Sequence, residues 1–234
     1  MFVYFSVVNG ISLECPPNMC RSKWDFCGEG PEYCAEGNRK TTTTTITAAA
    51  AVNQGLNPKD YIFDFLNSET GRANGTGGQA VAATSKNFPA LVSNGMAMTV
   101  GYIGPCGINL PHTHPHATEM NLILDGKFQS GFYDFNTNTF VMNEVRKHMV
   151  SLFPRGVIHF EQNLNCKPAT FVATFNSDVP GVLTIADGFF GLPAEIVGAS
   201  LGGLSVEKIE DLKQYLPKNP AIGVASCRKR CHLD

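Results

Sequence analysis

The 234-residue sequence predicts a mainly β domain, a sandwich or barrel, with α-helices at its C-terminal end and a small cysteine-rich segment before it. Strand-like runs recur at short spacing from about residue 97 to 175. Helix signals begin at residue 193, and half of the eight cysteines lie in residues 15–36. Short strands at such spacing are typical of sandwiches and barrels, and a chain of this length can bury a full core.

The expected strands follow from side-chain alternation. Residues 97–103 alternate apolar with small or polar side chains, as a half-buried strand does. Asp125-Gly126 separates two strand-like runs, and this pair favours a tight turn, so we expect a β-hairpin from residues 121–124 and 127–132. Further strands are expected over residues 140–145, 149–153 and 169–175.

Two helices are expected near the C-terminus. Pro193 favours the start of a short helix that runs to Val197 and is ended by Gly198. Ser205 is a favourable N-cap for a second helix, which Pro217 stops. We expect these helices to pack on the barrel or on a partner subunit, because apolar side chains share one face of the second: Val206, Ile209, Leu212 and Leu216.

Composition divides the chain into four segments. Residues 1–14 are a leader or a clipped signal segment, although the run lacks a basic start and a cleavage site. Residues 15–36 form the cysteine-rich module, and residues 37–54 form a Thr/Ala-rich linker with little to bury. The folded domain spans residues 55–234.

Charge and cysteine usage restrict the function classes. A net charge of -2 and a charged fraction of 16% leave no electrostatic footprint for nucleic acid, and no apolar run is long enough for a membrane span. The even number of cysteines predicts an oxidising compartment. The sequon Asn74-Gly75-Thr76 predicts glycosylation of Asn74 in a secreted protein.

Four side chains form the strongest candidate site, a metal centre. His112 and His114 are two residues apart, so on a strand both imidazoles face the same side. Glu119 lies an odd number of residues further on, and we infer that a bend at Pro115 resets the register and turns it inward. His159 follows a Pro-Arg-Gly turn that would bring another strand alongside.

Three imidazoles and a carboxylate suit a divalent first-row metal. Zinc prefers a closed four-ligand site or three ligands plus water, whereas four protein ligands leave two open positions on octahedral manganese or iron. The bland alternative, that these are ordinary surface or core residues, accounts less well for four ligand-type side chains at this spacing.

The same segments resemble the two motifs of germin-like cupins, H-x-H-x4-E and P-x-G-x2-H-x3-N. The second is carried by Pro154, Gly156, His159 and Asn163. Gly104-Pro105-Cys106-Gly107 and Asn163-Leu164-Asn165-Cys166 resemble the fungal and slime-mould, spherulin-like branch. The resemblance covers roughly residues 60–234. It implies a double-stranded β-helix, the cupin jelly-roll barrel, with bound Mn2+, secretion, and homo-oligomers held by C-terminal helices.

Two departures from the family pattern bear on function. His148 stands where the family usually has glycine, and we expect it in an inter-strand turn, not among the ligands. Plant oxalate oxidases hold oxalate with two asparagines. Asn109 matches one as a substrate-binding residue, but Thr99 stands in place of the other and lacks an amide, which tells against oxalate.

Two disulfides are expected in the barrel domain. The two motifs pair in the family fold, which implies a bridge between Cys106 and Cys166. Cys227 and Cys231 are four apart, at the upper edge of bridging distance on a helix, and a second bridge is expected there. Zinc held by this pair is the alternative, but two thiolates with only His232 nearby make a poor site.

The N-terminal module resembles a truncated hevein-like chitin-binding module. The family has a Cys-Cys pair where this chain has Cys20-Arg21, and the partner of that second cysteine is also missing. The resemblance implies the bridges Cys15–Cys27 and Cys20–Cys34, worth roughly 3 kcal/mol each in the chain-entropy model.

Four residues of this module would contact the sugar. Aromatic rings can lie flat against N-acetylglucosamine units while a serine bonds the acetamide. The alternative is a remnant whose aromatics only cover its own bridges. By resemblance the contacting residues are Ser22, Trp24, Phe26 and Tyr33.

The sequence therefore predicts a secreted manganese protein, with iron as the alternative metal, held at chitin or another wall polymer. As an oxidoreductase it would act on a small carboxylate such as oxalate, or on superoxide. One rival is a non-catalytic metal-binding wall, storage or stress protein. Another is a cupin oxygenase or isomerase acting on an unknown metabolite.

Overall fold

The computed structural model describes residues 7–8, 11–12, 20–21, 27–28 and 55–233. The chain divides into two compact units, Met1–Thr47 and Ala48–Asp234. In the first unit, β1 (Val7–Val8) pairs with β2 (Ile11–Ser12), and β3 (Cys20–Arg21) pairs with β4 (Cys27–Gly28), both antiparallel. The predicted linker and sugar-contacting residues lie outside the described residues, and so do Cys15 and Cys34.

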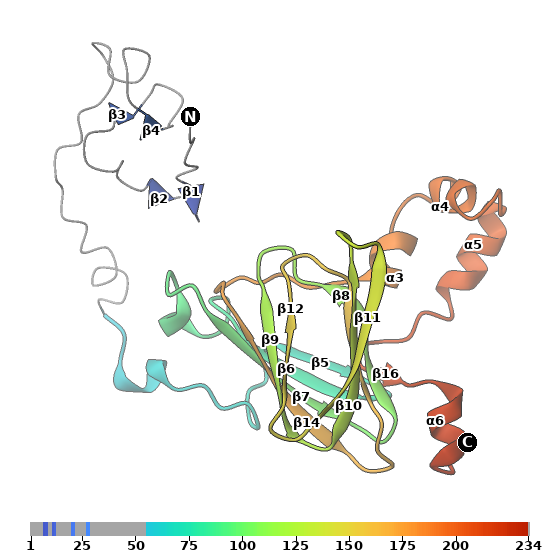
Figure 1. Ribbon diagram of the computed structural model, residues 1–234, viewed down its shortest axis with the longest axis horizontal. Coiled ribbons are helices and arrows are strands. Elements are labelled where there is room, and N and C mark those ends of the chain that lie inside the picture. Colours follow the sequence, from blue (N-terminus) through green and yellow to red (C-terminus); the bar gives the residue numbers. More distant parts are fainter. Residues whose placement is uncertain (1–6, 9–10, 13–19, 22–26, 29–54, 234) are drawn as a thin grey trace. The chain divides into compact units, whose positions relative to one another are not determined.

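The second unit is built on two antiparallel sheets that face each other (Figure 1). The first sheet has the order β12-β9-β14-β7-β6-β5, with bounds Val150–Phe153, Glu119–Asp125, Ala169–Phe175, Ala97–Ile103, Gly78–Ala83 and Arg72–Gly75. The second has the order β11-β10-β13-β8-β15, with bounds Thr139–Arg146, Lys127–Asp134, His159–Asn163, Gly107–Thr113 and Leu183–Thr184. A short strand, β16 (Ala221–Ile222), also pairs with β8. The mainly β jelly-roll prediction is confirmed.

Side chains from both sheets fill the space between them. On β14 the burial alternates strictly, so Phe171, Ala173 and Phe175 face the core. Phe128 of β10 meets Phe171 edge to face, with ring centroids 5.7 Å apart. Gly101 of β7 makes room for that ring, because a Cβ at Gly101 would lie 2.4 Å from it.

The hairpin predicted around Asp125-Gly126 is wrong. β9 and β10 are consecutive but belong to different sheets: β9 pairs with β12 and β14, whereas β10 pairs with β11 and β13. Gly126, at φ +85°, carries the chain from one sheet to the other, and its missing side chain leaves room for Ala169. The Asp-Gly pair predicts only the local bend of the chain. Which strands pair depends on how the two sheets bury their apolar faces against each other. A hairpin does join β10 to β11 through residues 135–138.

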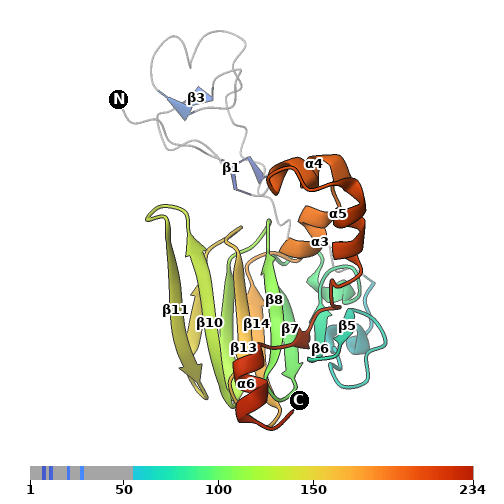
Figure 2. The same ribbon diagram turned by 90° about the vertical axis from the view of Figure 1, so that its right-hand side faces the viewer.

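The helices follow the barrel strands. α3 (Ile185–Phe190), α4 (Ala194–Ser200) and α5 (Val206–Lys213) lie beyond one end of the barrel, and α6 (Ala225–Arg230) lies at the other (Figure 2). Single 3-10 turns span Pro58–Tyr61 and Pro89–Leu91. None of the helices in the described part of the chain is long and apolar enough to cross a membrane.

The start of α4 and the cap of α5 match the sequence prediction. Ser205 Oγ accepts a hydrogen bond from Lys208 N, as expected of an N-cap. The predicted end of α4 at Gly198 is wrong, because the helix continues to Ser200. Gly198 is instead the point where α4 meets Leu204, whose carbonyl oxygen would lie 2.2 Å from a Cβ.

The predicted pairing of the barrel-domain cysteines is also wrong. Cys106 is bonded to Cys227, and Cys166 to Cys231. Residues four apart on a helix have Cβ atoms about 5–6 Å apart, too far for an unstrained bridge. Cys227 on α6 and Cys231 directly after that helix therefore both bond to the barrel, where Cys106 and Cys166 lie close together. The two bridges clamp α6 to the barrel.

Candidate metal centre

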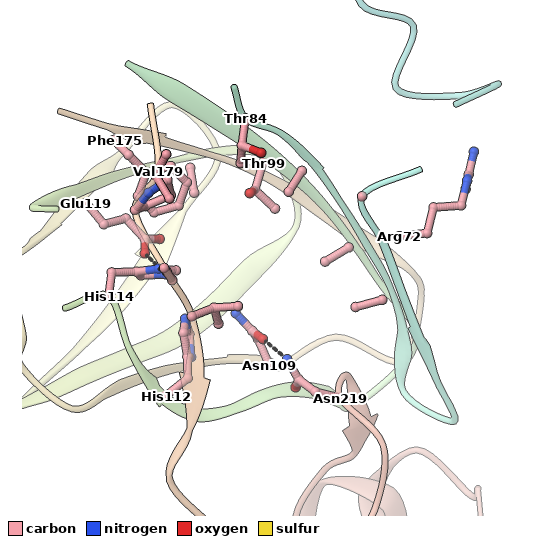
Figure 3. A pocket seen from close by; sticks show the side chains of 18 of the residues that line it. Arg72, Thr84, Thr99, Asn109, His112, His114, Glu119, Phe175, Val179 and Asn219 are labelled. Carbon is pink, nitrogen blue, oxygen red and sulfur yellow. Dashed lines mark hydrogen bonds and ion pairs between the residues drawn. The ribbon is translucent and has the colours of Figure 1, made fainter. Parts of the chain in front are cut away.

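The four predicted ligand residues converge inside the barrel, and Figure 3 labels His112, His114 and Glu119 among them. His112 lies on β8, His114 directly follows that strand, Glu119 begins β9 and His159 begins β13. Their ligand-type atoms all lie within 4.8 Å of one another. The residues are 2, 7, 2 and 2% exposed. The convergence arises because β8, β9 and β13, which belong to the two facing sheets, bring these residues together.

A β-bulge aims β8 at the site. His159 lies opposite His112 and Glu161 lies opposite Asn109, so residues 109–112 of β8 contain one residue more than the stretch 159–161 of β13 that they face. Asn109 and His112 thus both face inward despite their odd spacing. Pro111 lies in the bulge, where its missing amide hydrogen costs no ladder bond.

A turn supplies the second change of register. Pro115 and His116 form it where the chain leaves β8 and enters the opposite sheet. Glu119 then faces the barrel interior, and its Oε2 lies 3.1 Å from Nε2 of His114 and 3.1 Å from Nε2 of His159.

Backbone carbonyls orient all three imidazoles. Nδ1 of His112 is 2.8 Å from Leu110 O, and Nδ1 of His159 is 3.0 Å from Val157 O. Nδ1 of His114 bonds Gly181 O. A carbonyl oxygen only accepts, so each Nδ1 carries a proton and each Nε2 is turned into the site, where it can bind a cation or, when protonated, donate a hydrogen bond. This is the arrangement that protein-bound metals favour in their histidine ligands.

Burial and mutual charge set the ionisation of the four groups. Burial, together with the charge of His159, lowers the pKa of His112 to about 3. Burial alone would raise the pKa of Glu119, but hydrogen bonds with His114 and His159 hold it below its usual range. Burial alone would lower the pKa of His159, but the hydrogen bond to Glu119 outweighs that effect. The pKa of His159 is therefore raised. The metal-free site therefore holds a carboxylate that attracts protons or a cation.

This donor set fits a divalent first-row cation. Three Nε2 lone pairs and a carboxylate oxygen face one another at close range, and lone pairs repel unless a proton or cation lies between them. Imidazole and carboxylate together suit manganese, iron or zinc. No thiolate of the described residues joins this group.

A buried polar chain behind the ligands was missed by the sequence analysis. Asn121 Nδ2 donates to Glu119 Oε1 (3.3 Å) and to Glu161 Oε1 (3.1 Å). Asn109 Nδ2 donates to Glu161 Oε2 (2.9 Å), and Asn219 Nδ2 donates to Asn109 Oδ1 (2.6 Å). Strand periodicity could have revealed part of it, because Asn121 and Glu161 each lie two residues after a ligand.

Glu161 is the unusual member of this chain. It is fully buried, and burial together with the charge of Glu119 raises its pKa to about 8. Its two oxygens accept from different amides, so it holds Asn109 and Asn121 in fixed orientations. Through Asn121 that order reaches the ligand Glu119.

A cavity of about 510 Å³ opens beside the ligands. His112, His114 and Glu119 border it, and so do the predicted substrate residue Asn109 and the departure Thr99. Figure 3 shows Thr99 across the cavity from Asn109. Asn109 already uses its Oδ1 and one amide hydrogen within the polar chain, which leaves one hydrogen for a ligand.

His148 and Asn163 have structural roles. His148 is at φ +70° in the turn before β12, a conformation that favours glycine, and it is outside the ligand group, as predicted. Asn163 Nδ2 donates to the carbonyls of Ile103, Gly104 and Lys167, so this motif residue ties three loops together.

Asn74 is exposed on the edge strand β5, where a glycan could be attached. Cys20 is disulfide-bonded. The predicted partners Cys15 and Cys34 lie outside the described residues, as do Ser22, Trp24, Phe26 and Tyr33.

Comparison with known proteins extends these findings. The profile of the family described as Cupin matches residues 64–203, and that described as Chitin recognition protein matches residues 8–42. Spherulin-1A of Physarum polycephalum is 52% identical over 176 residues, covering 75% of this chain and 72% of that protein. A germin-like protein of Mesembryanthemum crystallinum is 36% identical, covering 58% and 60%. A solved oxalate oxidase shares the fold, with a TM-score of 0.59 and 21% identity, over 86% of this chain and 96% of that one.

Proposed function

Since this chain belongs to the cupin family, with spherulins and germin-like proteins as relatives, we propose that it is a secreted manganese-binding oxidoreductase held at chitin-bearing walls. Its substrate is a small carboxylate. The observation that carries this proposal is the buried group of three imidazoles and one carboxylate beside a cavity.

His112, His114, Glu119 and His159 would hold the metal. We propose manganese, with iron as the alternative. Both ions are redox-active and accept this mixed set of nitrogen and oxygen donors. A bound ion of this kind supplies positive charge for an anionic substrate and a change of oxidation state. Four protein ligands on a six-coordinate ion leave room for a substrate oxygen.

The chain's own residues orient the substrate. The free amide hydrogen of Asn109 faces the cavity beside the ligands and can donate to a carboxylate oxygen. Asn219 and Glu161 hold that amide on both sides, so the donor is preorganised. Thr99 offers a hydroxyl where a second amide would be needed to clasp oxalate from both sides.

Superoxide dismutation is the second candidate reaction. Superoxide needs only a metal reached from a cavity, so Thr99 would not matter to it. His112, His114 and Glu119 border the cavity directly, which favours access by such a small anion.

The N-terminal module would place this activity at the wall. The match to a chitin recognition family over residues 8–42 supports chitin binding, and we propose that Ser22, Trp24, Phe26 and Tyr33 make the contacts. Retention of the full chain on chitin beads, compared with Trp24→Ala, tests this. Equal retention of the two proteins would end the idea.

Metal analysis of the purified full chain is the first test of the catalytic proposal. We expect about one first-row ion per chain, mainly manganese, followed by carboxylate-dependent peroxide formation or accelerated superoxide decay. Absence of any first-row metal would overturn the site. Metal without either activity would leave a non-catalytic wall or storage protein, and the oxidoreductase proposal would fall.

A further inference from the structure

The cavity beside the ligands is too large for oxalate alone. Its volume is about 510 Å³, within the range of roughly 300–1,000 Å³ that sites for drug-sized ligands occupy. Oxalate, with only two carbons, would fill a small part of it. The remaining space must suit another part of the substrate, or water.

The walls of that remaining space are apolar and made of small side chains. Ala80 and Ala82 of β6 and Ala173 of β14 line it, together with Phe171 and Phe175. Ala80 and Ala82 are half-buried, so their methyl groups remain open to the cavity. Their register partners on β7 are Gly101, which has no side chain, and Thr99, whose side chain is short. The side chains that form this wall are therefore short on both neighbouring strands, β6 and β7.

Cationic groups are scarce around the cavity. Among the described residues that line it, Arg72 and Lys86 are the basic ones besides histidines. The Arg72 guanidinium is occupied: Nη1 donates to Gln79 Oε1 (2.9 Å), Nη2 to Leu66 O (2.5 Å) and Nε to Ser68 O. Figure 3 shows its side chain directed away from the ligand histidines, at the far side of the cavity. Lys86 is exposed.

A second carboxylate against β6 would therefore face alanine methyls, because the Arg72 guanidinium is already hydrogen-bonded and turned away and the Lys86 side chain is exposed to solvent. Burying an unpaired charge costs far more than burying a methylene gains. Asn109 borders the cavity beside the candidate ligands, where it can face an anionic head, whereas Thr84 and Thr99 lie across the cavity from it and carry no charge (Figure 3). The chemistry of the walls thus favours one anionic head at the ligands and an uncharged body along β6.

We propose that the cavity binds a monocarboxylate with an apolar body, which lies against Ala80, Ala82 and Ala173. The inference rests on the proposed function, since the carboxylate head is assigned to the ligand end. Ala80 and Ala82 then determine specificity by their small size.

Calorimetric titration of the manganese-loaded full chain tests the inference. The probes are glycolate, 2-hydroxybutanoate, 2-hydroxyhexanoate and oxalate. Affinity should rise by roughly fourfold for each methylene added to the 2-hydroxy acids, the gain expected for methylene burial. Oxalate should bind less tightly than 2-hydroxyhexanoate.

Two cavity-filling variants locate the effect. In Ala80→Leu and in Ala82→Leu, the ratio of the affinities for 2-hydroxyhexanoate and glycolate should fall at least tenfold. Ala199→Leu, at an exposed alanine of α4, should keep the wild-type ratio. The unfolding midpoint and the metal content of each variant show whether it has folded. If one leucine variant fails to fold, the affinity ratio is measured on the other.

The outcomes separate this inference from the proposed function. If glycolate binds but affinity does not rise from glycolate to 2-hydroxyhexanoate, the apolar-body inference is overturned and the proposed function still stands. An unchanged ratio in both folded leucine variants would also overturn it. Absence of metal, or of binding by every carboxylate including oxalate, would overturn the proposed function and the inference with it.

Discussion

His112 and His159 lie opposite each other on the paired strands β8 and β13, with ring centroids 4.1 Å apart. Each ring is oriented by a backbone carbonyl two residues before it in the chain. The pair thus depends on a strand register, which explains how a bulge in β8 can position a ligand.

Removal of this pair should abolish metal binding. In His112→Ala/His159→Ala, two of four donors are lost, and we expect metal content to fall at least tenfold after dialysis. The measurement is metal analysis by mass spectrometry beside circular dichroism. His148→Gly is the control and should keep full metal content, because His148 is outside the ligand group. Metal retained by the double variant would contradict the assignment.

The stability of the metal-free protein should fall as pH rises from about 4.5 to about 8 because of Glu161. Its pKa is raised from 4.5 to about 8 in the folded state. Between these values the folded protein binds a proton that the unfolded chain does not. The contribution is therefore fully present below pH 4.5 and lost as pH passes the folded pKa, at up to about 1 kcal/mol per pH unit.

Urea unfolding of the metal-free protein at several pH values measures this effect, with disulfides intact. Glu161→Gln is the matched variant, because its amide stays neutral throughout. The difference in unfolding free energy, wild type minus variant, should decline across this window. A difference that is flat with pH would show that Glu161 is already ionised in the folded protein.

Loss of one bridge should destabilise the barrel domain strongly. Cys106 and Cys227 are separated by 121 residues, and a loop of that order is worth about 5 kcal/mol in the chain-entropy model. We expect Cys106→Ala/Cys227→Ala to lose this amount in denaturant unfolding, although Cys166–Cys231 still tethers α6.

The pairing itself can be mapped independently. Non-reducing digestion after alkylation at acidic pH, followed by mass spectrometry, should yield peptides joined through Cys106–Cys227 and Cys166–Cys231. A Cys106–Cys166 peptide would contradict the observed pairing and restore the one expected from the sequence.

Glycine in place of His148 should stabilise the protein slightly. A left-handed conformation costs a residue with a Cβ about 1 kcal/mol, and glycine removes this cost. Part of the gain is offset because glycine has more conformational entropy in the unfolded state. We expect His148→Gly to raise the unfolding free energy by about 0.5 kcal/mol, measured by urea unfolding. The hydrogen bond from His148 N to Ile123 O should persist in the variant. Destabilisation by more than 1 kcal/mol would mean that the imidazole makes a stabilising contact.

Much of the barrel could be predicted because strand identity is local. Residues 97–103 and 169–175 have alternating side chains, and the structure forms β7 and β14 over the same bounds. The strands β5 and β6 were not predicted, since Gly78–Ala83 is built of small residues with little strand preference. The two-residue strands β15 and β16 are too short to carry any period.

Partners were harder to predict than elements. Asp125-Gly126 correctly indicated a sharp turn, but the strands on either side joined different sheets. Cys227 lies on α6 and Cys231 directly follows it, and only the barrel beside them decided where each would bond. Short-range signals report how the chain bends, whereas pairing depends on which distant segments bury each other's apolar faces.

The sequence by itself determined the fold class and the identity of the candidate ligands, because a period of two and the chemistry of imidazole and carboxylate are local properties. The tertiary structure alone decided that a bulge turns Asn109 and His112 to the same side, and that Glu161 joins Asn109 to Asn121 behind the ligands. It also decided that small side chains on β6 leave a large cavity beside them. The physical reason is that register, burial and empty volume arise only when separate strands are packed together.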